Sequence, residues 1–283
     1  MSVKIITDSA SDIRIDEATL LDITILPLKT NIDGVEYLDG VTITHEEFYE
    51  KLSSCKQLPT TSQLTPFEFE TAYKDALQNH DEAVVITLSG KLSGTYQSAC
   101  TAAMEYEGKV FVVDSENATV GQQLLVKYAL RLRDRGLSAE SIANELNEVK
   151  SRICLVALVD TLDYLVKGGR LSKTAGIAGS LLQIKPVLGV EDGEVKVLGK
   201  ARGAKQSNNM LTETIAKKGG IDFSMPLVLA YSGNDDSLLQ DYIENSRSIW
   251  EGNIDELLVS VIGSTIGTHA GPGAIAVAFF AKV

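Results

Sequence analysis

The sequence predicts a two-domain α/β protein with an N-terminal parallel sheet that carries helices on both faces and a C-terminal mixed α/β domain. Apolar, β-branched segments alternate with helical patterns through the first half, which is typical of a Rossmann-like parallel sheet. After about residue 152 the pattern is more mixed and includes a hairpin signal at Asp192-Gly193. We therefore expect domains over residues 1–151 and 152–283, with the loop and helix near 58–76 free to pack against the second domain.

The composition excludes several classes of protein. The chain has 283 residues, of which 26 are basic and 38 acidic, and its formal net charge is −12. A net negative charge does not attract nucleic acid or an anionic membrane, so we expect no electrostatic binding to either. The three cysteines are far apart, so we expect a reducing, cytoplasmic setting without disulfides. The three histidines lie far from other candidate ligands, and we expect no metal site.

In the first half, short apolar segments predict strands, and capping signals mark where helices begin. The predicted strands cover 3–6, 83–88 and 109–113, and helices are expected to begin near 44, 65, 94, 119 and 138.

The second half mixes strands, helices and one glycine-rich loop. Predicted strands cover 152–159, 185–190, 194–198, 227–231, 257–261 and the last residues to 283. Predicted helices cover 160–165, 174–182, 204–218 and 235–250. The loop covers 266–274.

The segment from Ser89 to Ala99 joins a buried strand to a helix. In β-loop-α-β units, ligands bind beyond the carboxyl ends of strands, near helix N-termini. Free N–H groups near Gly94, with the hydroxyls of Ser93 and Thr95, suit a carboxylate or a phosphate. The same residues would also form an ordinary helix cap, and these residues alone leave both interpretations open.

Two other polar segments follow predicted elements. Residues 60–63 lie between Pro59 and Pro66, which predicts a rigid polar loop that either connects elements or presents its hydroxyls to a site. Asp8 and Ser9 follow the first strand, where capping of the next helix is favoured over contact with a ligand.

His269 lies among Gly, Thr and Pro residues rather than on an apolar face. The neighbouring Gly267, Gly271 and Gly273 would let the backbone approach a ligand closely. A histidine beside an anion is also favoured in its charged, donating form. We therefore favour a binding role for His269 over a purely structural one.

Two arginines lie next to glycines. Arg170 follows Gly168-Gly169, and Arg202 precedes Gly203, so we expect both side chains to be exposed. The sequence leaves three roles open for these arginines: a solvated surface charge, docking to a partner, or steering of a phosphate.

Familiar catalytic and nucleotide motifs are missing. Gly90-Lys91 lacks the GxxxxGK[ST] pattern of a P-loop, and the chain has no GxGxxG. Ser93 is not within the GxSxG elbow of serine hydrolases, which disfavours that class.

Taken together and in order, six segments resemble the DegV family, whose characterised members are the bacterial fatty acid-binding subunits of fatty acid kinase, called FakB. The likeness covers the whole chain, and its segments are Thr7-Asp-Ser-Ala-Ser-Asp12, Pro59-Thr-Thr-Ser-Gln63, Leu92-Ser-Gly-Thr-Tyr-Gln-Ser-Ala99, Val113-Asp-Ser115, Leu165-Val-Lys-Gly-Gly-Arg170 and Gly267-Thr-His-Ala-Gly-Pro-Gly-Ala274.

The resemblance implies two α/β domains with a fatty acid held between them, the first similar to the sugar-binding part of dihydroxyacetone kinases. It places the carboxylate at the positions of Thr61, Ser93 and His269, and the tail in a tunnel of the second domain. It implies no catalytic residue, cofactor or ATP site. Beside these positions we expect Ser62, Gly94, Thr95 and Thr268 to contribute to carboxylate binding, and Arg170 and Arg202 to dock the partner.

We therefore expect a cytoplasmic carrier, inactive alone, that presents a long-chain fatty acid to an ATP-binding kinase subunit for acyl phosphate formation in phospholipid synthesis. The resemblance also allows transient membrane contact for lipid exchange. Candidate tail contacts are residues 175–182, Ile184 and Phe279, although an ordinary core would use the same residues. The alternatives are a serine-type hydrolase acting on a lipid ester and a regulatory module that binds another small acid.

Overall fold

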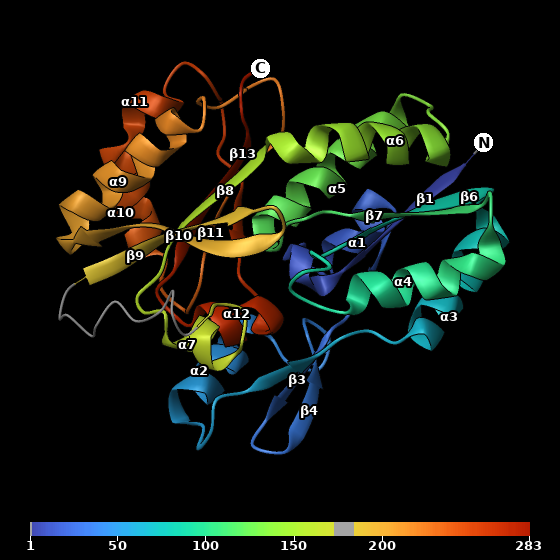
Figure 1. Cartoon of the computed structure of the whole chain (residues 1–283), viewed down its shortest axis with the longest axis horizontal. Coiled ribbons are helices and arrows are strands. Elements are labelled where there is room, and N and C mark those ends of the chain that lie inside the picture. The colour runs from blue at the N-terminus through green and yellow to red at the C-terminus, as the bar shows by residue number, and fades with distance from the viewer. Residues whose placement is uncertain (1, 173–183) are drawn as a thin grey trace.

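The computed structural model describes residues 2–172 and 184–283 of the chain. Figure 1 shows two sheets side by side, with helix α5 (Thr119–Asp134) between them. The first sheet has four parallel strands in the order β2-β1-β6-β7. Its strands are β1 (Val3–Asp8), β2 (Ile23–Leu26), β6 (Glu82–Thr87) and β7 (Val110–Asp114).

Helices cover both faces of this sheet, which confirms the predicted fold class. Helices α3 (Pro66–Asn79) and α4 (Thr95–Ala103) pack on the face that carries Ile6 and Val85. Helices α5 and α6 (Ala139–Val149) pack on the face that carries Ile5 and Val84. The predicted capping boxes are present at Thr44, which begins α2 (His45–Ser54), and at Thr65, which begins α3.

The second sheet has six strands in the order β10-β9-β8-β13-β11-β12, of which only the β11–β12 pair is parallel. The Asp192-Gly193 hairpin is confirmed, because both residues have positive φ in the turn between β9 and β10. The strands are β8 (Ile153–Leu158), β9 (Ile184–Glu191), β10 (Glu194–Arg202), β11 (Leu227–Tyr231), β12 (Val259–Val261) and β13 (Ile275–Phe280).

Three helices pack on the outer face of the second sheet, around Phe279 and Val156. They are α9 (Gly203–Lys217), α10 (Ser237–Asn245) and α11 (Arg247–Trp250). The inner face of the sheet packs on α5, where Leu124 and Leu125 belong to the same core as Ala276 and Ala278. The two sheets therefore share one hydrophobic core through α5, and the predicted domain boundary at residues 151–152 stays a prediction.

A small antiparallel sheet in the order β4-β3-β5 was not predicted. Its strands are β3 (Lys29–Ile32), β4 (Val35–Leu38) and β5 (Thr60–Ser62). The expected loop at 60–63 is thus largely a strand, because Thr61 pairs with Thr30 of β3. The Asp33-Gly34 turn is the sequence signal for the β3–β4 hairpin, and both residues have positive φ.

The expectation of a loop at 266–274 is also wrong, because helix α12 (Ser264–Ala270) occupies most of this segment. Its sequence is a poor helix former, but distant side chains bind its first backbone N–H groups. Asp39 accepts from the N–H groups of Ser264 at 2.8 Å and Thr265 at 3.3 Å. Helix α12 packs against α2 and the short helix α7 (Asp163–Lys167), and the three helices lie near one another in Figure 1. A further short helix among the described residues is α1 (Glu17–Leu21).

Within the described ranges, no helix has the length and apolar character needed to cross a bilayer.

Candidate functional site

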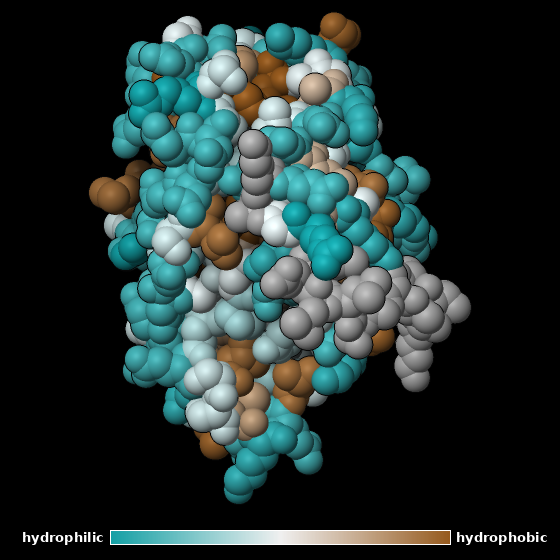
Figure 2. All heavy atoms as spheres, turned by 90° about the vertical axis from the view of Figure 1, so that its left-hand side faces the viewer, coloured by the Kyte–Doolittle hydropathy of each residue, from teal (hydrophilic) through white to brown (hydrophobic). Residues whose placement is uncertain are grey.

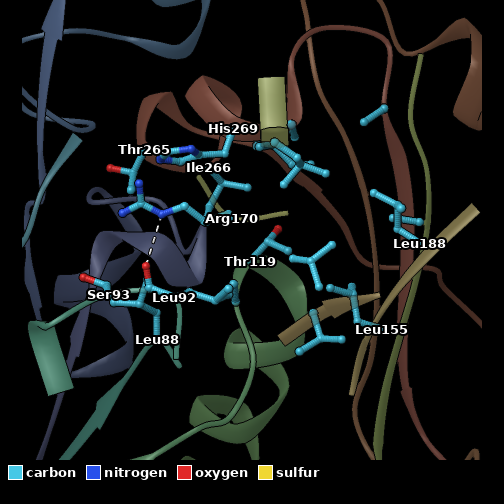
Figure 3. Close-up of a pocket in the computed structure, with 18 of the residues that line it drawn as sticks. Leu88, Leu92, Ser93, Thr119, Leu155, Arg170, Leu188, Thr265, Ile266 and His269 are labelled. Atoms are coloured by element: carbon cyan, nitrogen blue, oxygen red, sulfur yellow. Dashed lines mark hydrogen bonds between the residues drawn. The ribbon is translucent and has the colours of Figure 1, made fainter. Parts of the chain in front are cut away.

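A cavity lies between the two sheets, and its two ends differ in chemistry (Figure 3). One end is lined by polar side chains from three separate elements: Thr61 from β5, Ser93 from the loop before α4, and His269 from α12. The other end is lined by aliphatic side chains, including Leu155 of β8 and Leu188 of β9. The cavity is therefore amphipathic along its length.

The polar end is organised by two hydrogen bonds between side chains. Thr61 Oγ1 lies 2.9 Å from His269 Nε2, and Ser93 Oγ lies 2.9 Å from Thr95 Oγ1. Ser93 therefore pairs with a threonine while His269 pairs with a different one, so the two do not form a nucleophile–base pair. This arrangement argues against the serine hydrolase alternative.

His269 is half-buried in the wall of the cavity. Burial, together with the nearby Arg170 cation, lowers the pKa of His269 from its ordinary 6.5 to about 4. The imidazole is therefore neutral at pH 7 when no anion lies beside it. Its Nδ1 atom is buried and has no hydrogen-bond partner among the described residues.

Arg170 is half-buried and lines the cavity, so the expectation of an exposed side chain is wrong for this residue. Its Nη1 donates to the carbonyl of Gly168 at 2.7 Å, and its Nε donates to the carbonyl of Leu92 at 3.2 Å (Figure 3). Burial lowers the pKa of Arg170. The guanidinium thus links the end of α7 to the loop that carries Ser93.

A surface groove lies on the other side of Arg170. Leu92, Arg170 and Val195 line both the inner cavity and this groove, whose outer part includes Lys91 and Lys196. Among the described residues, the cavity and the groove therefore meet at these three shared side chains.

The structure brings four of the seven predicted carboxylate-binding residues to the cavity wall: Thr61, Ser62, Ser93 and His269. Thr95 is fully buried behind Ser93, and Thr268 Oγ1 donates to the Ser264 carbonyl within α12 at 2.8 Å. A Cβ at Gly94 would lie 2.1 Å from Gln63 Oε1, so this glycine makes room for a neighbouring side chain.

The other predicted polar residues lie outside the cavity wall. Arg202 is exposed at the end of β10, as expected. Asp8 Oδ1 accepts from the Ala10 N–H at 3.0 Å, which confirms the capping interpretation of that residue.

The apolar end lies on the inner face of the second sheet. Ala157 of β8 pairs directly with Ala276 of β13 there, and both line the cavity. Small side chains at paired positions leave space between this sheet and α5. Phe279 is wrong as a tail contact, because strand alternation directs it to the core on the opposite face. Residues 175–182 lie outside the described residues, as does the side chain of Ile184.

Sequence reasoning missed part of the α12 face. Thr265 and Ile266 line the cavity together with His269, and their spacing of three and four residues puts them on one side of a helix. That spacing was the sequence signal for a shared face, but it indicates a shared face only in a helix, and the segment was expected to be a loop. Gln63 and Thr119 were also missed as lining residues.

Known proteins resemble this chain over nearly its whole length. A family model described as "Uncharacterised protein, DegV family" matches residues 2–282. A DegV domain-containing protein from Caldanaerobacter subterraneus is 41% identical over 281 residues, which cover 99% of each chain.

Solved structures share the fold over the full length. A DegV family protein from Thermus thermophilus, described for its fatty acid binding, has a TM-score of 0.89 and 32% identity, with 100% of both chains covered. The fatty acid kinase B3 protein from Streptococcus pneumoniae, loaded with linoleic acid, has a TM-score of 0.85 and 100% coverage of both chains. Its 24% identity shows a common fold.

The environment of His269 predicts its titration. Because its pKa in the folded protein lies near 4, below the ordinary 6.5, the stability that the neutral ring contributes is complete above pH 6.5 and is lost as the pH falls through about 4. In the ligand-free protein, the His269 imidazole resonance should stay constant from about pH 8 to about pH 5.5. Nuclear magnetic resonance with a His269→Gln variant for assignment tests this, and a midpoint near 6.5 would contradict it.

Proposed function

We propose that this chain, which belongs to the DegV family, binds one long-chain fatty acid and presents its carboxylate to a separate ATP-dependent kinase subunit. The observation that carries the proposal is the amphipathic cavity, with hydroxyl, imidazole and guanidinium groups at one end and aliphatic side chains at the other. A fatty acid has the same division between an anionic head and an apolar tail.

In this proposal the carboxylate accepts hydrogen bonds from the hydroxyls of Thr61 and Ser93. The Thr61 hydroxyl can donate to the ligand while its oxygen accepts from His269 Nε2–H, which lies 2.9 Å away. The positive charge of Arg170 lies at the same end of the cavity and favours an anion over a neutral head-group. A bound carboxylate would also raise the pKa of His269 from its low value, because it stabilises the imidazolium.

The tail lies along the inner face of the second sheet, over Ala157 and Ala276. Each buried methylene contributes about 0.8 kcal/mol, so a long chain supplies most of the affinity. Figure 2 shows hydrophilic residues over most of one face of the protein, with hydrophobic residues in separate patches. An interior tail site is consistent with such a surface. The fatty acid binding described for the Thermus thermophilus relative supports the same assignment.

The proposed partner is an ATP-binding kinase subunit that forms the acyl phosphate, while this chain has no activity of its own and needs no cofactor. The side chains that line both the cavity and the surface groove, Arg170 among them, support a route from the groove to the carboxylate. Arg202 is an exposed cation on an acidic chain and suits a carboxylate or phosphate on the partner. We propose docking roles for both arginines, and exchange of the fatty acid through transient membrane contact.

The first prediction concerns the ligand. Purified protein should carry about one long-chain fatty acid per chain, because burial of the tail is worth about 0.8 kcal/mol per methylene. Organic extraction and mass spectrometry measure this. A protein that carries no fatty acid and binds none when it is added would contradict the carrier function, and another bound acid would favour the regulatory module.

The second prediction concerns the head-group end. Thr61→Val and Ser93→Ala should each weaken oleate binding roughly ten- to a hundredfold, because one hydrogen bond to a charged group is worth ~1.5–3 kcal/mol. Thr101→Val is the matched control, since Thr101 is exposed on α4, outside the cavity lining. Titration calorimetry gives the Kd, and circular dichroism checks the fold. Unchanged affinity in both folded variants would place the carboxylate elsewhere.

The third prediction separates binding from docking. Arg202→Ala should retain its fatty acid but form acyl phosphate roughly tenfold more slowly at low carrier concentration, because an exposed charge mainly affects association. Arg247→Ala, another exposed arginine, is the control. The assay adds the kinase subunit and ATP and measures acyl phosphate at several carrier concentrations. Wild-type rates would make Arg202 an ordinary surface charge.

Arg170→Ala is measured in the same assay, and its lipid content decides between two roles for Arg170. Retained lipid with slow acyl phosphate formation would support docking. Loss of lipid would instead make Arg170 a ligand of the carboxylate.

A further inference from the structure

Helices α7 and α12 each end on a glycine that faces a ring of the other helix. Gly168 caps α7 and lies against His269 of α12, and Gly271 caps α12 and lies against Tyr164 of α7. A Cβ at residue 168 would lie 2.2 Å from His269 Nδ1, and a Cβ at residue 271 would lie 2.4 Å from the Tyr164 ring. These two reciprocal contacts set the distance between the helices.

The backbone at Gly168 does not itself require glycine. Its φ of −74° and ψ of −8° are ordinary right-handed values that any residue adopts. Gly169 is the opposite case: its φ is +75°, and a Cβ there would meet no described atom within 4 Å. The space taken by the His269 ring, together with the Tyr164 carbonyl, is therefore the reason for glycine at 168, whereas backbone conformation is the reason at 169.

The contact matters because, in the part of the chain that the structure describes, no hydrogen bond orients the Nδ1 side of the His269 ring. In many sites a histidine is held by a bond from one ring nitrogen while the other serves the ligand. Here Nε2 lies 2.9 Å from Thr61 Oγ1, but the buried Nδ1 has no partner among the described residues. The backbone of Gly168 is what the Nδ1 edge packs against, so a steric contact fixes the direction of Nε2.

Gly168 also contacts the cation of the polar end, Arg170. Its carbonyl accepts from Arg170 Nη1 at 2.7 Å. One residue therefore sets the place of both the imidazole and the guanidinium.

We propose that Gly168 is a positioning residue of the carboxylate site, which acts by leaving the space that His269 needs to face Thr61. The inference rests on the proposed function. A methyl group at 168 has little room to yield, because the Tyr164 carbonyl lies 2.9 Å from it on another side. In Gly168→Ala the imidazole must rotate or shift, and its bond to Thr61 is lost.

A double-mutant cycle tests this contact. The variants are Gly168→Ala, His269→Ala and the double variant, and Gly169→Ala is the control. For each variant, the Kd for oleate and the midpoint of thermal unfolding are measured. Gly168→Ala should weaken oleate binding roughly tenfold and lower the midpoint. In the His269→Ala background the same change should leave the Kd nearly unchanged and lower the midpoint by less, because only the contact with the Tyr164 carbonyl remains. Gly169→Ala should lower the midpoint but keep the Kd within about twofold.

A spectroscopic measurement separates positioning from general destabilisation. In Gly168→Ala the His269 resonance should shift and titrate at higher pH than in the unsubstituted protein, because a displaced ring is less buried. An unchanged resonance and titration would overturn the proposal, as would equal effects of Gly168→Ala with and without the His269 ring.

Two outcomes need separate interpretation. If Gly168→Ala fails to fold and the double variant folds, the proposal is supported; if neither folds, the Tyr164 carbonyl rather than His269 demands glycine, and the proposal falls. If the unsubstituted protein binds no oleate, the proposed function fails, whereas thermal unfolding and the His269 resonance still test the contact itself.

Discussion

The carboxylate of Asp39 makes the contact on which the binding site depends. It is 4% exposed and accepts from Ser9 Oγ, from both the N–H and the hydroxyl of Ser264, and from the N–H of Thr265. A buried carboxylate is tolerated when its oxygens are fully hydrogen-bonded in this way. The bonds join the 3-10 helix after β1 (Ser9–Ser11) to the first turn of α12, and so they place the cavity-lining face of α12 opposite Thr61 and Ser93.

The cavity exists because the packing around α5 is uneven. Along most of its length α5 is buried between the two sheets, where Leu124 and Leu125 fill the shared core. Near its first residue, Thr119, the facing positions on the second sheet are Ala157 and Ala276, which are too small to fill the gap. The core is closely packed around Leu124 and Leu125, whereas side-chain volume is missing near Thr119. The missing volume forms the apolar part of the cavity, and the rest of the core stays closely packed.

Charge is arranged so that the cavity differs from the surface. The chain as a whole carries a net charge of −12, yet the polar end of the cavity presents the cation Arg170 and a neutral His269. Keeping the imidazole neutral avoids two neighbouring positive charges in a half-buried site. Among the described residues that line the cavity, an incoming anion would meet one cation and several neutral hydrogen-bond donors.

Elements with local sequence signals could be predicted from the amino-acid sequence alone. The parallel sheet, the capping boxes at Thr44 and Thr65, and the hairpin at Asp192-Gly193 follow from strand and turn patterns within a few residues. The sequence also singled out Ser93 and His269 as candidate binding residues, and the structure places both side chains at the cavity wall. Only the tertiary structure decided that 264–270 is a helix, that Arg170 faces inward and that Phe279 lies in the opposite core. Each of these depends on partners far away in the chain: Asp39 for the helix, the carbonyl of Leu92 for Arg170, and the pairing register of β13 for Phe279.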